Sequence, residues 1–322
     1  MNAADDGGAD RFKVVVTERE QLAPEAVGFR FRRADDGDLP DWEPGSHIDV
    51  VIDEDTVRQY SLCGDRHDRG SYYIVVQREQ SGRGGSRYLA DELGAGTLIT
   101  ISAPRNHFQL TGANRYILVA GGIGITPLIP MARTLEAEGH EWTLYYGGRS
   151  QATMVFAADL QRAFPERVTL VPQDVAGVLD LDCIVAAAKT QRADVYACGP
   201  EGLLAALDER CHDAGVIFRS ERFAPKAPAQ PTHDSIFDVE LADSGITLSV
   251  PAGTSVLDAV SAAGIPTFSS CREGTCGSCE VRVLAGEIDH RDSILTDDEQ
   301  AAQDTMMICV SRAHSARLVI EL

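Results

Sequence analysis

The sequence predicts three successive domains: an antiparallel β-rich domain, a doubly wound α/β domain, and a small C-terminal domain that carries a cysteine cluster. Runs rich in β-branched and aromatic residues occur before residue 112, among them FKVVVTE, HIDVVID, YYIVVQ and TLITIS. Turn residues separate these runs, a spacing typical of an antiparallel barrel or sandwich. Apolar runs then alternate with helical patterns, which predicts a parallel sheet covered by helices. A chain of 322 residues has room for two or three domains.

The α/β pattern begins with YILVA at 116–120, which is apolar throughout, as in a strand buried on both faces. Further strands are expected at 143–148, 168–173 and 194–198, with helices at 155–164, 180–189 and 201–214. The helix after YILVA should end at Gly139, with Thr126 as its N-cap and Pro127 at its first position. One helix, at 84–93, is expected inside the β-rich domain.

A Pro/Ala-rich segment, APKAPAQPTH, separates the α/β pattern from the C-terminal domain and predicts a stiff, extended linker. FDVELADSGITLSVPAG then predicts a hairpin, and the run up to Gly264 predicts a helix. VRVLAGE and RLVIEL have the character of strands. The expected boundaries are a disordered N-terminus at 1–11, the β-rich domain at 12–112, the α/β domain at 113–224, the linker at 225–233 and the cysteine domain at 234–322.

The charge of the chain argues against some partners. The formal net charge is −20, and residues 233–322 hold 15 acidic against 5 basic side chains, so half of the excess lies in this last part. Phosphate backbones are bound by Lys and Arg, so we expect no nucleic-acid partner. The acidity of the last part either serves solubility or steers a basic partner surface.

The N-terminal segment MNAADDGGADR has neither a basic region nor an apolar stretch, so it is not a signal peptide. No run of the sequence approaches the ~20 apolar residues of a membrane helix. We therefore expect a cytoplasmic, monomeric protein without a membrane partner, whose eight cysteines are reduced or metal-bound.

Four cysteines have the spacing of a plant-type 2Fe-2S ferredoxin, C-x4-C-x2-C and then a fourth after 29 residues: Cys271, Cys276, Cys279 and Cys309. Gly274 and Gly277 let the loop wrap tightly and turn backbone N–H groups toward the sulfurs. Arg272 adds positive charge. The alternative is a four-cysteine zinc site, but such sites usually contain two C-x2-C pairs, and this sequence has one.

A dinucleotide site is indicated by a GxGxTP turn that follows YILVA and includes Gly121, Gly122, Gly124 and Thr126. Backbone N–H groups and a helix dipole can hold a pyrophosphate there. A second turn, at Cys198, Gly199 and Pro200, ends a later strand of the same sheet. Because ligands bind at the carboxyl ends of such strands, both turns should face one cleft. Each turn alone could equally be a helix-capping turn.

A flavin site is indicated by RQYSL in the β-rich domain. Arg58 can pair with a phosphate, Tyr60 can pack on an isoalloxazine face and Ser61 can hydrogen-bond its edge, with Gln59 as a further cofactor contact. The helix at 84–93 opens on a natural phosphate seat, formed by Gly82, Arg83, Gly84, Gly85 and Ser86. Alone, RQYSL could simply be a surface strand.

Taken together, these stretches resemble the phthalate dioxygenase reductase and vanillate demethylase reductase family, within the ferredoxin-NADP reductase superfamily. The resemblance extends over nearly the whole chain from residue 12, and the stretches follow in family order. They are RQYSLCGD, GRGGSRYL, PRNHFQL, VAGGIGITP, ACGPEGL, ERF, SSCREGTCGSCE, DHRDSILTDDE and CVSRAHSA.

The resemblance implies an FMN-binding barrel, a doubly wound NAD domain and a C-terminal β-grasp ferredoxin domain. It implies FMN rather than FAD, with Arg83 and Ser86 near the phosphate. Ser61 and Phe223 would lie at the flavin ring. Cys198, from its own position at the end of a strand, is expected near the nicotinamide. These three are the expected catalytic residues.

The same resemblance places Asp174 where the family has an acidic residue that contacts the NADH ribose. A carboxylate there repels a 2′-phosphate, which favours NADH over NADPH. Arg149 could instead accommodate that phosphate. Gly147 and Gly148 stand where the family has larger residues, so the adenosine pocket departs from the family pattern.

The expected function is electron transfer from NADH through FMN and the 2Fe-2S cluster to a separate terminal oxygenase, of the Rieske aromatic-ring or demethylating type. The alternatives are a cytochrome P450 as acceptor, a free-standing flavin, quinone or ferric reductase, and a zinc-stabilised nucleotide-binding regulator without turnover.

Overall fold

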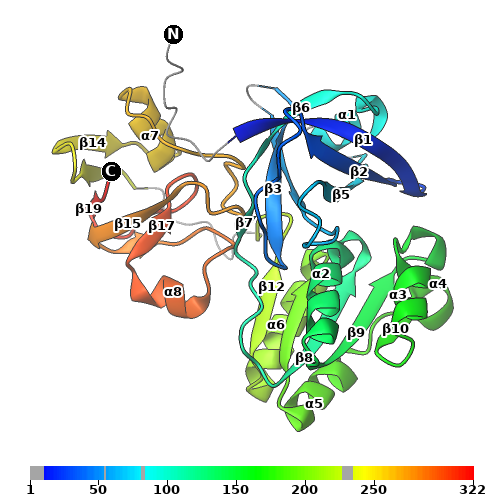
Figure 1. The fold of residues 1–322 in the computed structure, drawn as a ribbon. Coiled ribbons are helices and arrows are strands. Elements are labelled where there is room, and N and C mark those ends of the chain that lie inside the picture. The colour runs from blue at the N-terminus through cyan, green and yellow to red at the C-terminus, as the bar shows by residue number, and fades with distance from the viewer. Residues whose placement is uncertain (1–10, 54–55, 81–83, 227–234) are drawn as a thin grey trace. The chain divides into compact units, whose positions relative to one another are not determined.

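The computed structural model describes residues 11–53, 56–80, 84–226 and 235–322 (Figure 1). The chain divides into two compact units, one that ends at Glu221 and one that begins at Arg222. Residues 1–10 of the expected disordered segment and most of the expected linker lie outside the described residues, whereas Arg11, the last residue of that expected segment, begins strand β1. Among the described residues, no helix has the length and apolarity that crossing a membrane requires.

The first unit begins with an antiparallel, barrel-like sheet whose strand order is β4-β3-β6-β1-β2-β5, with β7 paired to β3. Its interior is lined by apolar side chains such as Phe29, Phe31 and Ile48. The sheet contains the four expected strand runs, and α1 forms where the helix was expected. The elements are β1 (Arg11–Ala23), β2 (Ala26–Arg33), β3 (Ser46–Val51), β4 (Val57–Ser61), β5 (Tyr72–Gln77), α1 (Gly85–Glu92), β6 (Leu98–Ser102) and β7 (Arg105–Asn106).

The first unit continues with a parallel sheet of order β10-β9-β8-β11-β12. The strand order reverses between β8 and β11, as in doubly wound folds. The strands are β8 (Arg115–Gly121), β9 (Glu141–Gly148), β10 (Val168–Pro172), β11 (Asp194–Cys198) and β12 (Phe218–Glu221). The helices are η1 (Gly122–Gly124), α2 (Ile125–Ala137), η2 (Gln151–Thr153), α3 (Ala157–Ala163), α4 (Gln173–Ala176), α5 (Leu181–Gln191) and α6 (Glu201–Ala214).

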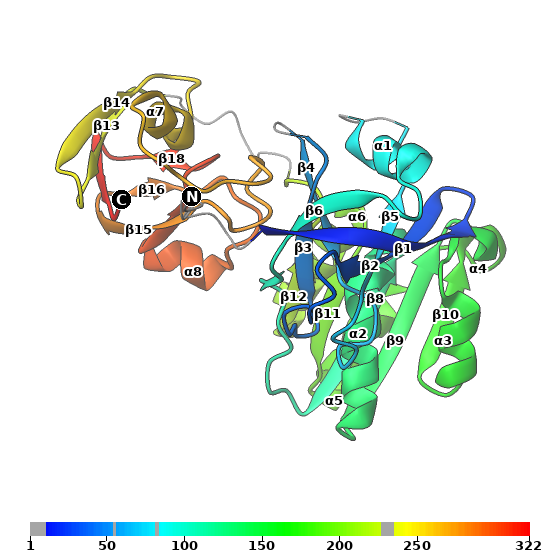
Figure 2. The same cartoon turned by 45° about the horizontal axis from the view of Figure 1, so that its top comes forward.

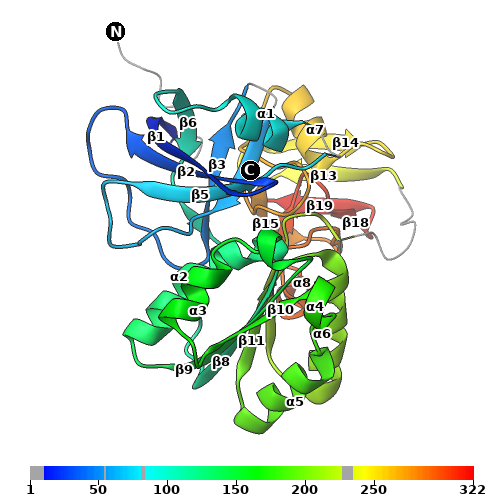
Figure 3. The same cartoon turned by 90° about the vertical axis from the view of Figure 1, so that its right-hand side faces the viewer.

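Helices cover both faces of this sheet (Figure 3). One core cluster packs α2 and α3 against Leu118 and Leu144, and another packs α5 and α6 against Ile117 and Val119. Alternate side chains of β8 therefore enter opposite cores, which explains why YILVA is apolar throughout.

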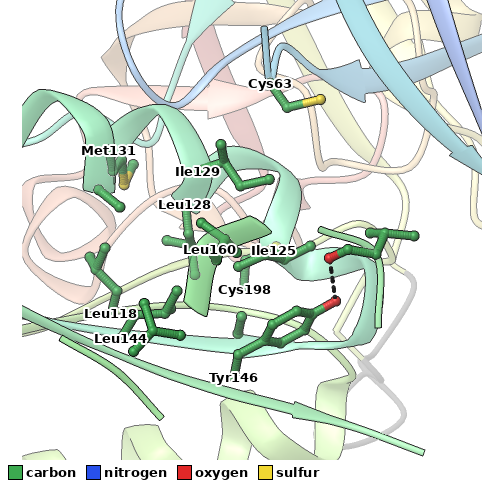
Figure 4. Packing of buried hydrophobic residues seen from close by; sticks show 14 of the residues in the cluster. Cys63, Leu118, Ile125, Leu128, Ile129, Met131, Leu144, Tyr146, Leu160 and Cys198 are labelled. Carbon is green, nitrogen blue, oxygen red and sulfur yellow. Dashed lines mark hydrogen bonds between the residues drawn. The ribbon is translucent and has the colours of Figure 1, made fainter. Parts of the chain in front are cut away.

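The two parts of the first unit share a core. The cluster beneath α2 also includes Cys63, Tyr73 and Phe108 from the barrel, and Arg133 of α2 donates a hydrogen bond to the Gly64 carbonyl at 3.3 Å. Figure 4 shows part of this cluster, where side chains of α2 pack over the strands and the Tyr146 hydroxyl donates to the Val155 carbonyl. The expected flavin and nucleotide domains thus form one packed body.

The start of α2 differs from the expectation. The helix begins at Ile125 with Gly124 as its N-cap, so Thr126 is not the N-cap and Pro127 is the third helical residue rather than the first. The short η1 turn runs directly into α2 and starts the helix earlier. The Thr126 hydroxyl is buried and donates to the Ile123 carbonyl at 3.0 Å.

The second unit contains a mixed sheet of order β14-β13-β19-β15-β17, with β13 and β19 parallel, and has its own core (Figure 2). The expected hairpin forms β13 and β14, and the expected helix is α7, capped by the Ser255 hydroxyl. The elements are β13 (Phe237–Leu241), β14 (Ile246–Val250), α7 (Val256–Ala262), β15 (Glu280–Ala285), β16 (Ile288–Asp289), α8 (Asp297–Ala302), β17 (Thr305–Met307), β18 (Arg312–Ala313) and β19 (Arg317–Ile320).

Candidate functional site

The two predicted nucleotide turns meet at the reversal point of the parallel sheet. A Cβ atom added to Gly199 would lie 2.9 Å from the Gly121 Cα, and one added to Gly124 would lie 2.1 Å from the Cys198 carbonyl oxygen. The two turns therefore pack backbone to backbone, a contact that only glycine permits. Gly122 differs, because a Cβ there would meet nothing within 4 Å and its φ is +55°.

The surroundings of these turns suit an anionic dinucleotide. Helix α2 starts directly after Gly124 and helix α6 starts after Pro200, so both N-termini lie at the carboxyl edge of the sheet. Neither N-cap residue makes a side-chain hydrogen bond to its helix. The Ile125 N–H at the start of α2 already donates to the Gly122 and Ile123 carbonyls, so the attraction of this helix end for a phosphate comes from the helix dipole. The structure thus brings the expected residues of both turns together.

Glu221, at the end of β12, links the barrel to the parallel sheet. Its Oε2 accepts a hydrogen bond from Ser61 Oγ of β4 at 3.2 Å, and it is the partner of Cys198 in the β11–β12 ladder. Burial raises the pKa of Glu221 to about 8 from an ordinary value of 4.5, against the opposing effect of the Ser61 hydrogen bond. The carboxyl group is therefore largely protonated at neutral pH.

Cys198 is fully buried beside this carboxyl group. Burial first, and then the charge of Glu221, raise the pKa of the Cys198 thiol well above its ordinary value. A reactive cysteine usually has a lowered pKa. The Cys198 thiol is therefore not prepared for nucleophilic attack, and its side chain belongs to the core cluster beneath α2.

Arg58 and the start of α1 form the second anion seat. A Cβ added to Gly85 would lie 2.7 Å from Arg58 Nε, so the guanidinium group packs directly on the first residue of the helix. Gly84 holds the N-cap position with φ +85° and offers no side-chain cap. The combination of a guanidinium group and free helix N–H groups fits a phosphate. Gly82 and Arg83 lie outside the described residues.

The side chains of β4 alternate between two faces. Arg58 and Tyr60 share one face, and Tyr60 packs against the barrel core, where burial raises the pKa of its hydroxyl group. Gln59 lies on the other face with Ser61, and its Nε2 donates to Asp49 Oδ1 at 3.1 Å. The same Asp49 oxygen accepts from Arg105 at 2.6 Å. Gln59 thus contacts a buried ion pair on the face away from Arg58 and Tyr60.

His47 lies across the β3–β4 ladder from Ser61. Its ring stacks with that of His107 at 6.0 Å between centroids. Burial, followed by the charges of Arg105 and His107, lowers the pKa of His47 to about 3. The ring beside Ser61 is therefore neutral at physiological pH.

Asp174 and Arg149 are neighbours at the carboxyl edge of β9 and β10. The Asp174 N–H donates to the Arg149 carbonyl at 3.2 Å, and both side chains are exposed. Leu179 packs over Gly147, and Met154 packs over Gly148. Larger side chains from elsewhere in the sequence thus fill the space above these two glycines.

Of the three expected catalytic residues, two are brought together by a residue that sequence reasoning missed. Ser61 donates a hydrogen bond to Glu221, and Cys198 is its partner in the β11–β12 ladder. Glu221 is the first residue of the ERF stretch. Phe223, the last letter of that stretch, is 48% exposed and belongs to the second unit. Within this stretch only the aromatic Phe223 was predicted as a site residue. A carboxylate at the carboxyl end of a parallel strand, such as that of Glu221, is itself a signal for a ligand site.

The four expected metal-ligating cysteines are buried together in the second unit: Cys271, Cys276, Cys279 and Cys309. The Cys309 thiol is within hydrogen-bonding reach of the Cys271 and Cys279 thiols, and the Cys276 thiol is within reach of Cys271. Among the described residues, no three His, Cys, Asp or Glu side chains surround a position for one metal ion. A cluster of two irons instead needs its four thiolates spread over two centres.

Backbone N–H groups point at these sulfurs. Cys271 Sγ accepts from the N–H groups of Glu273 and Thr275 at 3.3 and 3.5 Å, and Cys276 Sγ accepts from Ser278 at 3.5 Å. Arg272, whose charge was expected to act locally, has φ +57° and pairs with Asp258 at 2.9 Å. Hydrogen bonds of this kind stabilise the negative sulfurs of an iron–sulfur cluster, so the loop fits the group.

Three family models match the chain in succession. The oxidoreductase FAD-binding domain matches residues 13–110, the oxidoreductase NAD-binding domain matches 118–209, and the 2Fe-2S iron-sulfur cluster binding domain matches 239–314. Each match lies within one of the three expected domains. The chain is therefore an oxidoreductase with flavin, NAD and 2Fe-2S domains in this order.

Curated relatives match nearly end to end. The chain is 35% identical to a phthalate dioxygenase reductase of Burkholderia cepacia, with all of both chains covered. It is 36% identical to a vanillate O-demethylase oxidoreductase of a Pseudomonas strain, over 96% of this chain and 99% of the relative. It is 40% identical to a phenoxybenzoate dioxygenase subunit beta of Ectopseudomonas oleovorans, over 93% and 94%.

Two solved structures extend the comparison. A crystal structure of an intact type IV self-sufficient cytochrome P450 monooxygenase matches 97% of this chain with a TM-score of 0.89 and 42% identity. This chain spans only 41% of that longer protein. A phthalate dioxygenase reductase matches with a TM-score of 0.69 and 35% identity, over 97% of this chain and 98% of the other.

The cluster loop predicts the effect of Gly274→Ala. Gly274 has φ +69°, and an added Cβ would lie 2.6 Å from Val310 Cγ2 and 3.1 Å from the Asp292 Cα. The clash and the strained backbone should displace the loop, so the variant should lose most of its bound iron and its visible 2Fe-2S absorption. Gly253→Ala is the matched control, because Gly253 has φ +75° with nothing within 4 Å. Equal iron contents in the two variants would contradict the prediction.

The raised pKa of Glu221 predicts a pH-dependent stability. Between pH 4.5 and 8 the unfolded chain releases a proton that folded Glu221 retains, so the unfolding free energy falls as pH rises through this window. Glu221→Gln removes that loss and should melt higher than the parent at pH 9, by roughly 2–4 °C for each kcal/mol recovered. At pH 4.5 this advantage should be absent.

Thermal melts of the parent and of Glu221→Gln at the two pH values test this expectation. Glu209→Gln makes the same change on the exposed face of α6 and serves as the control. A melting-temperature difference between parent and Glu221→Gln that is the same at both pH values would show that Glu221 titrates normally.

The family assignment rests on end-to-end matches together with the cysteine loop, the paired glycine turns and the Arg58 seat seen in the structure. Relatives above 30% identity cover almost all of this chain and of their own length. The chain therefore belongs to the phthalate dioxygenase reductase and vanillate demethylase reductase family, within the ferredoxin-NADP reductase superfamily.

Proposed function

We propose that the protein is the reductase component of an oxygenase system, which passes electrons from NADH through FMN and its 2Fe-2S cluster to a separate terminal oxygenase. The observation that carries this proposal is the four-cysteine domain on the same chain as the flavin and NAD domains. Such a cluster accepts and releases single electrons. A reductase that passed hydride only to a small molecule would have no use for it.

The residues of the first unit have distinct parts in this proposal. Gly122 leaves room for the dinucleotide at the reversal point, and the N-termini of α2 and α6 attract its pyrophosphate. Cys198, uncharged and buried, supports the nicotinamide site from below, by packing under the turn that it begins with Gly199 and Pro200. Ser61 and protonated Glu221 hold a proton beside the flavin edge. The flavin, when bound, supplies the conversion of a hydride electron pair into single electrons.

FMN is proposed as the flavin, although the matching family model carries the name of an FAD-binding domain. Arg58 and the start of α1 make one compact anion seat, which suits a terminal phosphate. Heat release of the flavin and chromatography against FMN and FAD standards decide the matter. The monomeric state and the cytoplasmic location stay predictions.

The proposed acceptor is a Rieske-type oxygenase, because several relatives carry names of aromatic dioxygenase and demethylase systems. A cytochrome P450 is the second candidate, favoured by the 42% identity to part of a self-sufficient P450 monooxygenase. Rapid mixing of the NADH-reduced protein with a purified acceptor of each class, under anaerobic conditions, measures which one takes electrons.

Replacing Cys276 with Ser tests the order of electron flow. The variant should lose the 2Fe-2S absorption and the EPR signal of the reduced cluster, and reduction of the protein acceptor should cease. NADH should still bleach the flavin, because hydride transfer takes place in the first unit. Stopped-flow absorption and EPR after anaerobic NADH addition provide both readings.

Cys183→Ser is the matched control, because Cys183 is exposed on α5 and far along the sequence from the cluster. It should leave both signals unchanged. Loss of flavin reduction in the Cys276 variant would contradict the proposed separation of the two steps.

The preference for NADH should depend on Asp174. Asp174→Asn removes the charge that repels a 2′-phosphate, so kcat/KM for NADPH should rise by about tenfold, equivalent to roughly 1.4 kcal/mol. Arg149→Gln, made in the parent protein, should lower kcat/KM for NADPH, because it removes the positive charge that could accommodate the 2′-phosphate. Steady-state reduction of ferricyanide with each nucleotide measures both effects.

Asp159→Asn is the control, since Asp159 is an exposed acidic residue of α3. It removes one negative charge from the same domain and should leave the NADH-to-NADPH ratio unchanged. A ratio that shifts equally in both variants would mean that overall charge, rather than Asp174, sets the preference.

A further inference from the structure

Asp292 is a buried carboxylate at the point where three segments of the second unit meet. Its side chain is fully buried. Oδ2 accepts from the N–H groups of Ile294 and Leu295 at 3.2 and 2.8 Å. Oδ1 accepts from Ser311 Oγ at 3.5 Å and lies 3.5 Å from the Nδ1 atom of His290. The carboxylate therefore connects its own segment to the turn that carries the fourth cysteine.

Gly274 extends this connection to the loop of the first three cysteines. Its backbone lies against the Cα and Cβ atoms of Asp292, and its carbonyl accepts from the Ser293 N–H at 2.9 Å. The Gly274 N–H is within hydrogen-bonding reach of the Cys309 thiol. Asp292 thus supports the residue that bridges the two cysteine-bearing segments.

The carboxylate is ionised in the folded protein. Burial acts to raise the pKa of Asp292, but the His290 ring and the N–H groups of Leu295 and Ile294 outweigh it, so the net effect is a lowered pKa. Asp292 therefore keeps a negative charge inside the domain, close to the backbone that surrounds the cysteine sulfurs. Charges interact more strongly in such an interior than in water.

We propose that Asp292 is a positioning residue for the iron–sulfur cluster and that its buried negative charge lowers the reduction potential of the cluster. Reduction adds one electron to a group that is already negative, so a nearby fixed carboxylate disfavours the reduced form. Net charge and hydrogen bonding around the sulfurs are established determinants of such potentials. The inference rests on the 2Fe-2S domain of the chain and not on which acceptor it serves.

The test is a redox titration of purified full-length protein, with EPR as the readout, on Asp292→Asn and Asp292→Glu. The Asn variant should have a more positive midpoint potential, with at least about a threefold higher ratio of reduced to oxidised cluster at a fixed solution potential. The Glu variant keeps the charge and should remain near the parent. Iron content and visible absorption establish that each cluster is intact.

Asp243→Asn is the matched control, because Asp243 is an exposed acidic residue in the turn between β13 and β14 of the same unit. Its charge is screened by solvent, so its loss should leave the potential unchanged. A parental potential in an iron-replete Asp292→Asn variant would overturn the proposal. So would an equal shift in Asp243→Asn, which would assign the effect to net charge alone.

A second variant covers the case in which Asp292→Asn fails to retain iron. Retention by Asp292→Glu would then support the positioning role, and Ser311→Ala would test the charge. Removing the Ser311 hydroxyl takes away a hydrogen-bond donor that partly offsets the negative charge of Asp292. The reduction potential of the cluster should therefore become more negative. An unchanged or more positive potential in Ser311→Ala, or loss of iron from all three variants, would overturn the proposal.

Discussion

The close packing of two glycine turns, where the strand order of the parallel sheet reverses, determines much of the rest of the first unit. Gly121 against Gly199, and Gly124 against the Cys198 carbonyl, leave no space for a side chain. The contact sets how near β8 and β11 end to one another and where α2 and α6 begin. Cys198 and its ladder partner Glu221 are in turn placed opposite Ser61. The nucleotide seat and the Glu221 site thus depend on the same backbone contact.

The shared core of the first unit extends this constraint to the barrel. Side chains from β5 and from the segment after β7 enter the cluster beneath α2, so the barrel and the parallel sheet cannot shift separately without opening a packed interior. A hydrogen bond such as that between Ser61 and Glu221, which joins residues 160 positions apart, is therefore held by packing on both sides. Hydride transfer requires this kind of fixed geometry between two ligands.

The sequence was most informative where one residue type is required for a specific physical reason. The cysteine spacing, the apolar YILVA run and the glycine turns each follow from one such requirement, and the fold class was predicted from them. The ferredoxin-like loop could be assigned because thiolates and turn glycines have few other uses at that spacing. The helices of the parallel sheet were located within a few residues because their apolar periodicity is regular.

The sequence was less informative where a role depends on long-range packing. Strand β2 was not among the expected strands, although Phe29 and Phe31 alternate with arginines along it. Glu221 becomes a site residue only because distant Ser61 reaches it, and its raised pKa comes from burial that no local pattern records. Thr126 has the chemistry of an N-cap, but the η1 turn starts the helix earlier. Asp292 likewise gains its contacts from a turn 19 residues away.

The separate core of the second unit has a consequence for how the protein responds to change. Its buried cluster consists entirely of residues from Phe237 onward, whereas the barrel and parallel sheet share theirs. Free-energy changes caused by substitutions within these separate core clusters should therefore add independently, since coupling between core mutations requires shared packing. Under the proposed function, sequence change in the core of the cluster-bearing unit can then proceed without altering the core beneath the nucleotide turns. Natural selection could thus adapt one set of hydride-handling residues to many different electron acceptors.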